Sequence, residues 1–223
     1  VDVNTLLDNW GQSGVAIAYI HAEGGKHYSC LLEASGGGTS NAAAAEPVKP
    51  KPKFKIELPG VPILSDGKPD NQNCALIFTR GHIIQAMDCN QEGYLEEAFK
   101  LSSALREFDG VSCTDPRGPP AILGFGEHVF SGIGALGNFA AASELAFGTQ
   151  LQNTMANVLQ CRMHYGHPDL FDKLAIITQG GMSKGVKKLN LSEDIFAGME
   201  ATLRQRTIKH ISYFQVGKGR DMG

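Results

Sequence analysis

Short segments with alternating or clustered apolar residues recur along the chain, and this pattern is typical of β-strands. Residues 14–22 (GVAIAYIHA) and 26–34 (KHYSCLLEA) are separated by a segment with a Gly-Gly pair, which predicts a β-hairpin. Residues 54–58 (FKIEL) alternate and end at a Pro-Gly pair, which predicts another strand. Further short strands are expected at residues 74–81, 82–88, 121–124, 173–178 and 208–216.

Three segments have the spacing of apolar residues that is typical of helices. In residues 92–108 the apolar positions recur at helical intervals. Residues 142–159 predict a second helix that is bent or broken near Gly148, and residues 192–204 predict a third. Strands therefore alternate with helices, which favours an α/β fold with helices flanking the sheet.

Composition changes sharply between residues 35 and 53. This segment is rich in Gly, Ala, Pro and Lys and has almost no large apolar residue, which predicts a disordered linker or loop. It divides the chain into an N-terminal hairpin part, residues 1–34, and a core, residues 54–223. The chain begins without Met and stops inside a Gly-rich basic loop, so we expect a piece of a longer protein that is incomplete at its C-terminus.

The overall composition is that of a folded protein: of 223 residues, 42% are apolar and 19% are charged. The net charge of −3 and the pI of about 6.2 show no basic excess, which argues against a nucleic-acid partner. No run of about 18 apolar residues predicts a membrane span. The five cysteines include no C-x-x-C pair, which suits a reducing compartment. Cys161, His164 and His167 are spaced like metal ligands, but a fourth ligand at standard spacing is missing.

Loops that follow the expected strands combine glycines with basic and amide side chains. Ligands of α/β sheets bind beyond the carboxyl ends of strands. Glycine lets backbone N–H groups approach an anion and Lys or Arg neutralises it, so these loops suit a phosphate or diphosphate; solvated turns are the other interpretation. G-x-x-x-x-G-K-[ST] does not occur, and no G-x-G-x-x-G directly follows an expected strand. The candidate binding residues are Lys68, Asn71, Asn73, Lys184, Lys218 and Arg220.

Three acidic residues are candidates for catalysis: Asp88, Glu193 and Asp194. Asp88 ends the expected strand at residues 82–88. Asn190 and Glu193 have the spacing of a capping box, so helix capping alone can explain the acidic pair. The same helix start can also present a carboxylate as a general base. The residues by themselves leave both interpretations open.

A carboxylate base combined with basic glycine-rich loops suits a nucleotide-sugar transferase, which deprotonates an acceptor hydroxyl and stabilises a departing diphosphate. Many such enzymes hold a metal through a D-x-D motif, which this chain lacks. No cofactor is therefore assigned, and a divalent cation such as Mg²⁺ stays an open alternative. Two other classes remain: a glycoside hydrolase, which needs two carboxylates but binds no diphosphate, and a non-catalytic nucleotide-sugar-binding module.

Six segments closely resemble the catalytic core of 1,3-β-glucan synthases, the callose synthase family: DGKPDNQN, QAMDCNQEGYLEEAFK, GEHVF, RMHYGHPD, LSEDIFAGM and QVGKGRD. The resemblance runs from about residue 54 to residue 223. It implies an enzyme that adds glucose from UDP-glucose to a growing 1,3-β-glucan chain, with inversion. It also implies a glycosyltransferase-A-like, Rossmann-like mixed sheet with flanking helices.

The resemblance further implies a cellular setting. Members of the family are large integral proteins of the plasma membrane that make cell wall polysaccharide, and this segment would lie on the cytoplasmic face. The membrane would be contacted through segments outside this chain. The implied partners are UDP-glucose, the 1,3-β-glucan chain and a regulatory small GTPase subunit.

By position, the resemblance assigns roles to the acids. Asp88 matches the donor-site aspartate of the family, and Glu193 with Asp194 matches its essential acidic pair. This favours the catalytic interpretation of the pair and leaves open which of the two is the base.

The resemblance also assigns the basic residues. Lys68 matches the donor-site lysine, and Lys218 and Arg220 match the KGRD segment. The chain departs from the commoner family pattern at three positions, where Cys74, Gln179 and His82 replace His, Arg and Glu.

Overall fold

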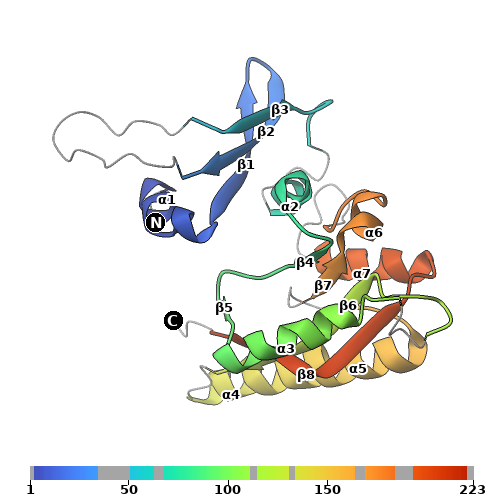
Figure 1. Cartoon of the computed structure of the whole chain (residues 1–223). Helices are drawn as coiled ribbons and strands as arrows, with labels where there is room; N and C mark the ends of the chain where they lie inside the picture. Colours follow the sequence, from blue (N-terminus) through green and yellow to red (C-terminus); the bar gives the residue numbers. More distant parts are fainter. Residues whose placement is uncertain are drawn as a thin grey trace. The chain divides into compact units, whose positions relative to one another are not determined.

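The computed structural model describes residues 3–34, 51–62, 68–110, 115–130, 134–163, 169–183 and 193–219. The chain divides into two compact units, Val1–Thr79 and Arg80–Gly223. Each unit combines helices with a β-sheet (Figure 1), so the chain is a mixed α/β protein. Within the described ranges, no helix has both the length and the apolar character needed to cross a membrane.

The first unit is built on an antiparallel sheet in the order β1-β2-β3. Its strands are β1 (Ala16–Glu23), β2 (Lys26–Glu33) and β3 (Phe54–Glu57), and its helices are α1 (Val3–Trp10), η1 (Gly11–Ser13), α2 (Lys68–Ala75) and η2 (Leu76–Phe78). β1 and β2 pair along their whole length. Gly24 and Gly25 close the turn with φ of 59° and 79°, which glycine adopts without strain. The predicted hairpin is confirmed.

The chain returns to this sheet after the predicted linker. Residues 35–50 of that segment lie outside the described residues. Lys53, at its end, donates its N–H to the Leu31 carbonyl at 2.8 Å, and its ammonium pairs with Glu33. β3 then pairs with β2. Both sides of the segment therefore belong to one unit, and the compact units separate only after Thr79. The proposed domain boundaries stay a prediction.

The expectation of a strand at residues 74–81 is wrong. α2 continues through Ala75, and a single 3₁₀ turn, η2, follows. Leu76 is buried, whereas Ile77 is 52% exposed, so this apolar run covers only one side of a helical turn. Periodicity alone cannot assign so short an apolar run to a strand or a helix.

The second unit contains a mixed sheet in the order β4-β7-β6-β8-β5. The central strands β6 (Ile122–Val129) and β8 (Ile208–Lys218) are parallel, and the other neighbours are antiparallel. β4 (Ile83–Gln85) and β5 (Gln91–Glu92) are the edge strands, and β7 (Leu170–Asp172) lies between β4 and β6. The helices are α3 (Leu95–Arg106), α6 (Lys173–Ile177), α7 (Glu193–Leu203) and a continuous helical rod (Figure 1) made of α4 (Gly134–Ser143), η3 (Glu144–Leu151), α5 (Gln152–Thr154) and η4 (Met155–Leu159).

The two faces of the central strands carry different side chains. Leu123 and Phe125 of β6 belong to an apolar cluster with Phe214 of β8 and residues of α3. The rings of Phe125 and Phe214 meet edge to face, with centroids 4.6 Å apart. Gly124 points to the opposite face, where it leaves room for the side chain of Arg162. The period of two along β6 therefore separates an apolar layer from a layer that accepts polar groups.

Three more predicted elements differ in type or in extent from those observed. Residues 173–178 were expected as a strand but form α6, because Asp172 Oδ1 accepts the Ala175 N–H at 2.7 Å and caps a helix there. The helix predicted at residues 142–159 is confirmed, but the helical path begins at Gly134 and widens to π-helical turns around Gly148. The strand predicted at residues 121–124 continues to Val129.

A buried histidine lies on the polar face of the sheet. His210 of β8 is opposite Gly124 of β6, and both of its ring nitrogens lack a hydrogen-bond partner within the described ranges. Burial, together with the positive charge of Arg162, lowers the pKa of His210 to about 4. His210 is therefore neutral in the folded protein at pH values where a free histidine becomes protonated.

Folding stability should consequently fall as the pH drops from about 6.5 to about 4. In this window the unfolded chain binds a proton at His210 and the folded chain does not, so each pH unit lowers the free energy of unfolding by up to about 1.4 kcal/mol. Thermal unfolding of the intact protein across this window measures the slope. His210→Gln should flatten it, whereas His128→Gln at an exposed position of β6 should not. An equally steep slope in His210→Gln would assign the pH dependence to other groups.

Candidate functional site

The carboxyl ends of the two parallel strands bring two predicted site residues together. Lys218 is the last residue of β8 and lies in register with Val129, the last residue of β6. Asp88 lies between β4 and β5, and β5 pairs with the end of β8, Gln91 opposite Lys218. Ligands of α/β sheets bind at this edge, so the position agrees with that of a binding site.

Lys218 lies among carboxylates. Its Nζ is 3.1 Å from Oε1 and 3.2 Å from Oε2 of Glu127, and 3.8 Å from Oδ2 of Asp88. The exposed fraction is 0% for the Glu127 side chain, 10% for that of Lys218 and 23% for that of Asp88. The Lys218–Glu127 pair is therefore inside the protein, and Asp88 is the member of the cluster that reaches solvent.

Gln91 links the two acids of this cluster. Its Nε2 donates to Oε1 of Glu127, and its Oε1 accepts the N–H of Asp88 at 2.8 Å. Asn90 and Gly219 exchange two hydrogen bonds of 2.9 Å, which fasten the turn that carries Asp88 to the end of β8. A buried network with these partners holds its side chains in a single arrangement.

Glu127 is a site residue that sequence reasoning did not select. It lies in the GEHVF segment, on the same face of β6 as Leu123 and Phe125. An acidic residue at an inward position of an apolar strand has to find a partner, because burying an unpaired carboxylate is strongly unfavourable. This break in the apolar pattern of β6 is the feature that could have identified Glu127.

The cluster contains two carboxylates, Asp88 and Glu127, and one ammonium, Lys218, so its formal charge is −1. This balance suits sugar hydroxyls, which donate to carboxylates, better than it suits a diphosphate. The two carboxylates do not fit a divalent cation as arranged, because the Lys218 ammonium already lies between them. Elsewhere in the described part of the chain, no three His, Cys, Asp or Glu side chains gather as metal ligands.

Three predicted binding residues lie in the first unit, on α2. Lys68 is the first residue of this helix, and Asn71 and Asn73 follow within it. Asn71 Oδ1 accepts the N–H of Ile20 in β1 at 3.1 Å. Asn71 therefore fastens α2 to the sheet, a structural role that the sequence did not indicate. The binding roles of the three residues stay a prediction.

The acidic pair stands at the start of a helix, as predicted. α7 begins at Glu193, and Asp194 follows. The side chains of both residues lie outside the described part of the structure, and so do Asn190, Lys184 and Arg220. The choice between capping and catalysis therefore rests on chemistry and on experiment.

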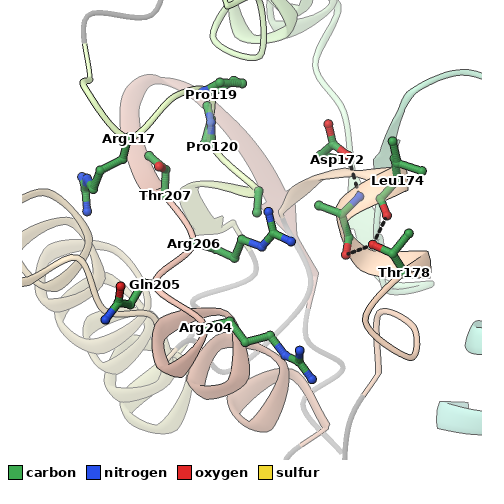
Figure 2. A pocket seen from close by; sticks show the side chains of 12 residues that line it. Arg117, Pro119, Pro120, Asp172, Leu174, Thr178, Arg204, Gln205, Arg206 and Thr207 are labelled. Atoms are coloured by element: carbon green, nitrogen blue, oxygen red, sulfur yellow. Dashed lines mark hydrogen bonds between the residues drawn. The ribbon is translucent and has the colours of Figure 1, made fainter.

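A pocket of about 760 Å³ opens at the opposite end of the sheet, beside the amino ends of β6 and β8 (Figure 2). Arg117, Arg204 and Arg206 line it. Hydrogen bonds from Arg117 lower the pKa of Asp115 to about 2, and Arg204 donates to Glu200 Oε1 at 3.0 and 3.1 Å. Neighbouring carboxylates thus balance two of the three guanidinium groups. The pocket is not a strong anion site and lies away from the cluster around Lys218.

The sequence has relatives among known proteins. It is 45% identical over 235 residues to callose synthase 9 of Arabidopsis thaliana, an alignment that covers 100% of this chain and 12% of that protein. It is 50% identical over 175 residues to callose synthase 4 of the same plant, in an alignment that covers 76% of this chain and 9% of that protein. It is also 50% identical over 185 residues to the 1,3-beta-glucan synthase component FKS1 of Aspergillus niger, in an alignment that covers 78% of this chain and 10% of that protein. The chain spans about a tenth of the length of these curated relatives.

The sequence also matches the profile of a protein family described as 1,3-beta-glucan synthase component, over residues 2–223. This match includes both compact units and the segment before residue 54, in which the motifs alone carry little resemblance. It also includes the strands and turns that bring Asp88, Glu127 and Lys218 together. The chain belongs to the 1,3-beta-glucan synthase family.

Proposed function

We propose that this chain forms part of the catalytic region of an inverting glycosyltransferase that adds glucose from UDP-glucose to a growing 1,3-β-glucan (callose) chain. The family match over residues 2–223 carries the proposal. The names of the relatives, callose synthase and 1,3-beta-glucan synthase component, supply the class of product. The donor and the inversion follow from the resemblance of the six motif segments.

In the proposed reaction, the 3-hydroxyl oxygen of the terminal glucose attacks the anomeric carbon of the donor. The bond from this oxygen to the carbon forms as the bond from the carbon to UDP breaks, and UDP leaves with the electron pair. Glu193 or Asp194 takes the hydroxyl proton as general base. Attack from the side opposite UDP inverts the configuration at the anomeric carbon.

The basic residues divide into two proposed roles. Lys68, Lys184 and Arg220 offset the charge that develops on UDP. Lys218 is better suited to holding Asp88, because its ammonium is already shared with the carboxylates of Glu127 and Asp88. Asp88, which reaches solvent, then accepts hydrogen bonds from hydroxyl groups of the donor glucose.

The proposal includes a glycosyltransferase-A-like architecture for the second unit. Support comes from the parallel pair β6 and β8, the helices that pack on it, and the polar cluster at the carboxyl ends of these strands. We place this region on the cytoplasmic face of the plasma membrane, in a protein whose membrane-spanning segments lie elsewhere in its sequence.

Two measurements on the intact, unmodified protein test the proposed function: binding of UDP-glucose, and transfer of labelled glucose into 1,3-β-glucan. We expect both. A glycoside hydrolase would cleave glucan without binding UDP, and a nucleotide-sugar-binding module would bind UDP-glucose without transfer. Either of these results would replace the proposal with the corresponding alternative.

Lys68→Ala should weaken UDP-glucose binding by roughly 10- to 150-fold, because a charge-assisted hydrogen bond to the diphosphate contributes about 1.5–3 kcal/mol. Isothermal titration of the intact protein measures the affinity. Lys51→Ala removes another lysine of the same unit, at an exposed position, and should leave the affinity unchanged. Equal affinities of the two variants would remove Lys68 from the donor site.

A further inference from the structure

Arg162 is buried between Gly198 of α7 and Gly124 of β6. Only 1% of its side chain is exposed. Its Nη2 forms an ion pair with Asp169, whereas Nε and Nη1 have no hydrogen-bond partner within the described ranges. Burying a guanidinium with two nitrogens that make no hydrogen bond is unfavourable for folding. The buried position of Arg162 therefore calls for a reason other than stability. The proposed reaction uses no group at this position.

α7 lies directly against the backbone of Arg162. A Cβ atom at Gly198 would be 2.6 Å from the carbonyl oxygen of Arg162 and 2.7 Å from its Cγ, so only glycine permits this approach. Thr202, one turn further along α7, accepts the Arg162 N–H on Oγ1 at 3.3 Å and donates to the Gly198 carbonyl at 2.9 Å. These contacts fix the position of α7 along and around its own axis.

The other end of the Arg162 side chain lies against the central sheet. A Cβ atom at Gly124 would be only 2.4 Å from Nη1 of Arg162, so the guanidinium occupies the space that a side chain on β6 would fill. His210 lies opposite Gly124 on β8. Arg162 therefore spans the gap between α7 and both parallel strands.

The ion-pair partner of Arg162 connects it to the turn that carries Asp88. The carbonyl of Asp169 accepts the N–H of Ala86 at 3.1 Å, two residues before Asp88 in the sequence. The strands that follow Asp169 and precede Ala86, β7 and β4, pair with each other. Arg162 thus links the helix that begins at Glu193 to the segment that leads to Asp88.

We propose that Arg162 is a positioning residue: it holds α7, and with it the acidic pair at the start of α7, at a set distance from Asp88. The inference rests on the proposed function. Gly198 is about 7.5 Å along the helix from Glu193, so a shift at Gly198 moves the whole helix start. A general base has to stay within hydrogen-bond reach of its proton, and a misplacement of about 1 Å lowers the rate by roughly 10²-fold.

Gly198→Ala in the intact protein tests the inference, because the added Cβ pushes α7 away from Arg162. Turnover is expressed per UDP-glucose-binding site, so that loss of folded protein does not count as loss of rate. We expect turnover per site to fall by roughly 10²-fold while donor affinity stays within about twofold. Gly110→Ala is the matched control: no atom lies within 4 Å of the added Cβ, and turnover should not change.

Two milder variants keep the inference testable if Gly198→Ala yields no donor-binding protein. Thr202→Val keeps the shape of the side chain and removes the oxygen that accepts the Arg162 N–H. Arg162→Lys keeps the positive charge and removes the planar guanidinium group. Both should lower turnover per site several-fold without weakening donor binding. Normal turnover per site in all the variants that bind donor would overturn the inference. Absence of donor binding and transfer in the unmodified protein would overturn the proposed function, and the inference with it.

Discussion

Glu193→Gln is expected to lower glucan synthesis by about 10²- to 10⁴-fold while UDP-glucose still binds. An amide has the size of the carboxylate but cannot accept the proton of the acceptor hydroxyl, and this is the contribution of a positioned general base. The measurement is transfer of labelled glucose by the intact protein, together with donor titration. Loss of transfer with retained binding places the defect in the chemical step rather than in folding.

The capping interpretation of the same residue gives the opposite forecast. Gln is accepted in place of Glu in a capping box, so a purely structural Glu193 should tolerate the change with a loss of a few tenths of a kcal/mol of helix-dipole interaction. Asp194→Asn, measured in parallel, shows which acid is the base. If only Asp194→Asn loses transfer, Asp194 is the base and Glu193 is the cap; normal transfer by both variants would leave the pair a structural role.

Local patterns predicted much of the fold. The hairpin of β1 and β2, the helices α3 and α7 and the strand β8 follow from apolar spacing and turn residues within a few positions of each element. The two incorrect strands, at residues 74–81 and 173–178, are short apolar runs without clear periodicity. At residues 173–178 the cap that Asp172 provides favours a helix, and the strand forms from the residues just before it.

The pairing of distant segments could not be predicted from one sequence. β8 inserts between β6 and β5, and this order brings Glu127 to Lys218, 91 positions away. The buried position of Arg162 likewise depends on glycines at 124 and 198, which are remote from it in the sequence. Such side chains look like ordinary surface charges until the segments that cover them are known.

Glu127→Gln and Lys218→Met are each expected to lower the free energy of unfolding by about 3–5 kcal/mol. Each change removes one charge of a buried pair and leaves the other without its partner in a low-dielectric environment. The double variant should be more stable than either single variant, since both charges of the buried Glu127–Lys218 pair are then removed together. Thermal or denaturant unfolding of the unmodified protein, the two single variants and the double variant gives the coupling free energy between the two residues.

The same four proteins separate the structural role of Lys218 from its role in the reaction. In the double variant, stability recovers but glucan synthesis should not, because Asp88 has lost the ammonium at 3.8 Å that holds it in place. Lys209→Met is the matched control, because it breaks an ion pair with Glu107 near the surface: the side chain of Lys209 is 46% exposed and that of Glu107 is 22% exposed. This change should lower the free energy of unfolding by at most about 1 kcal/mol and leave glucan synthesis intact. If the loss in free energy of unfolding in the double variant equals the sum of the losses in the two single variants, Glu127 and Lys218 are not energetically coupled. If the double variant recovers synthesis together with stability, Asp88 does not depend on Lys218.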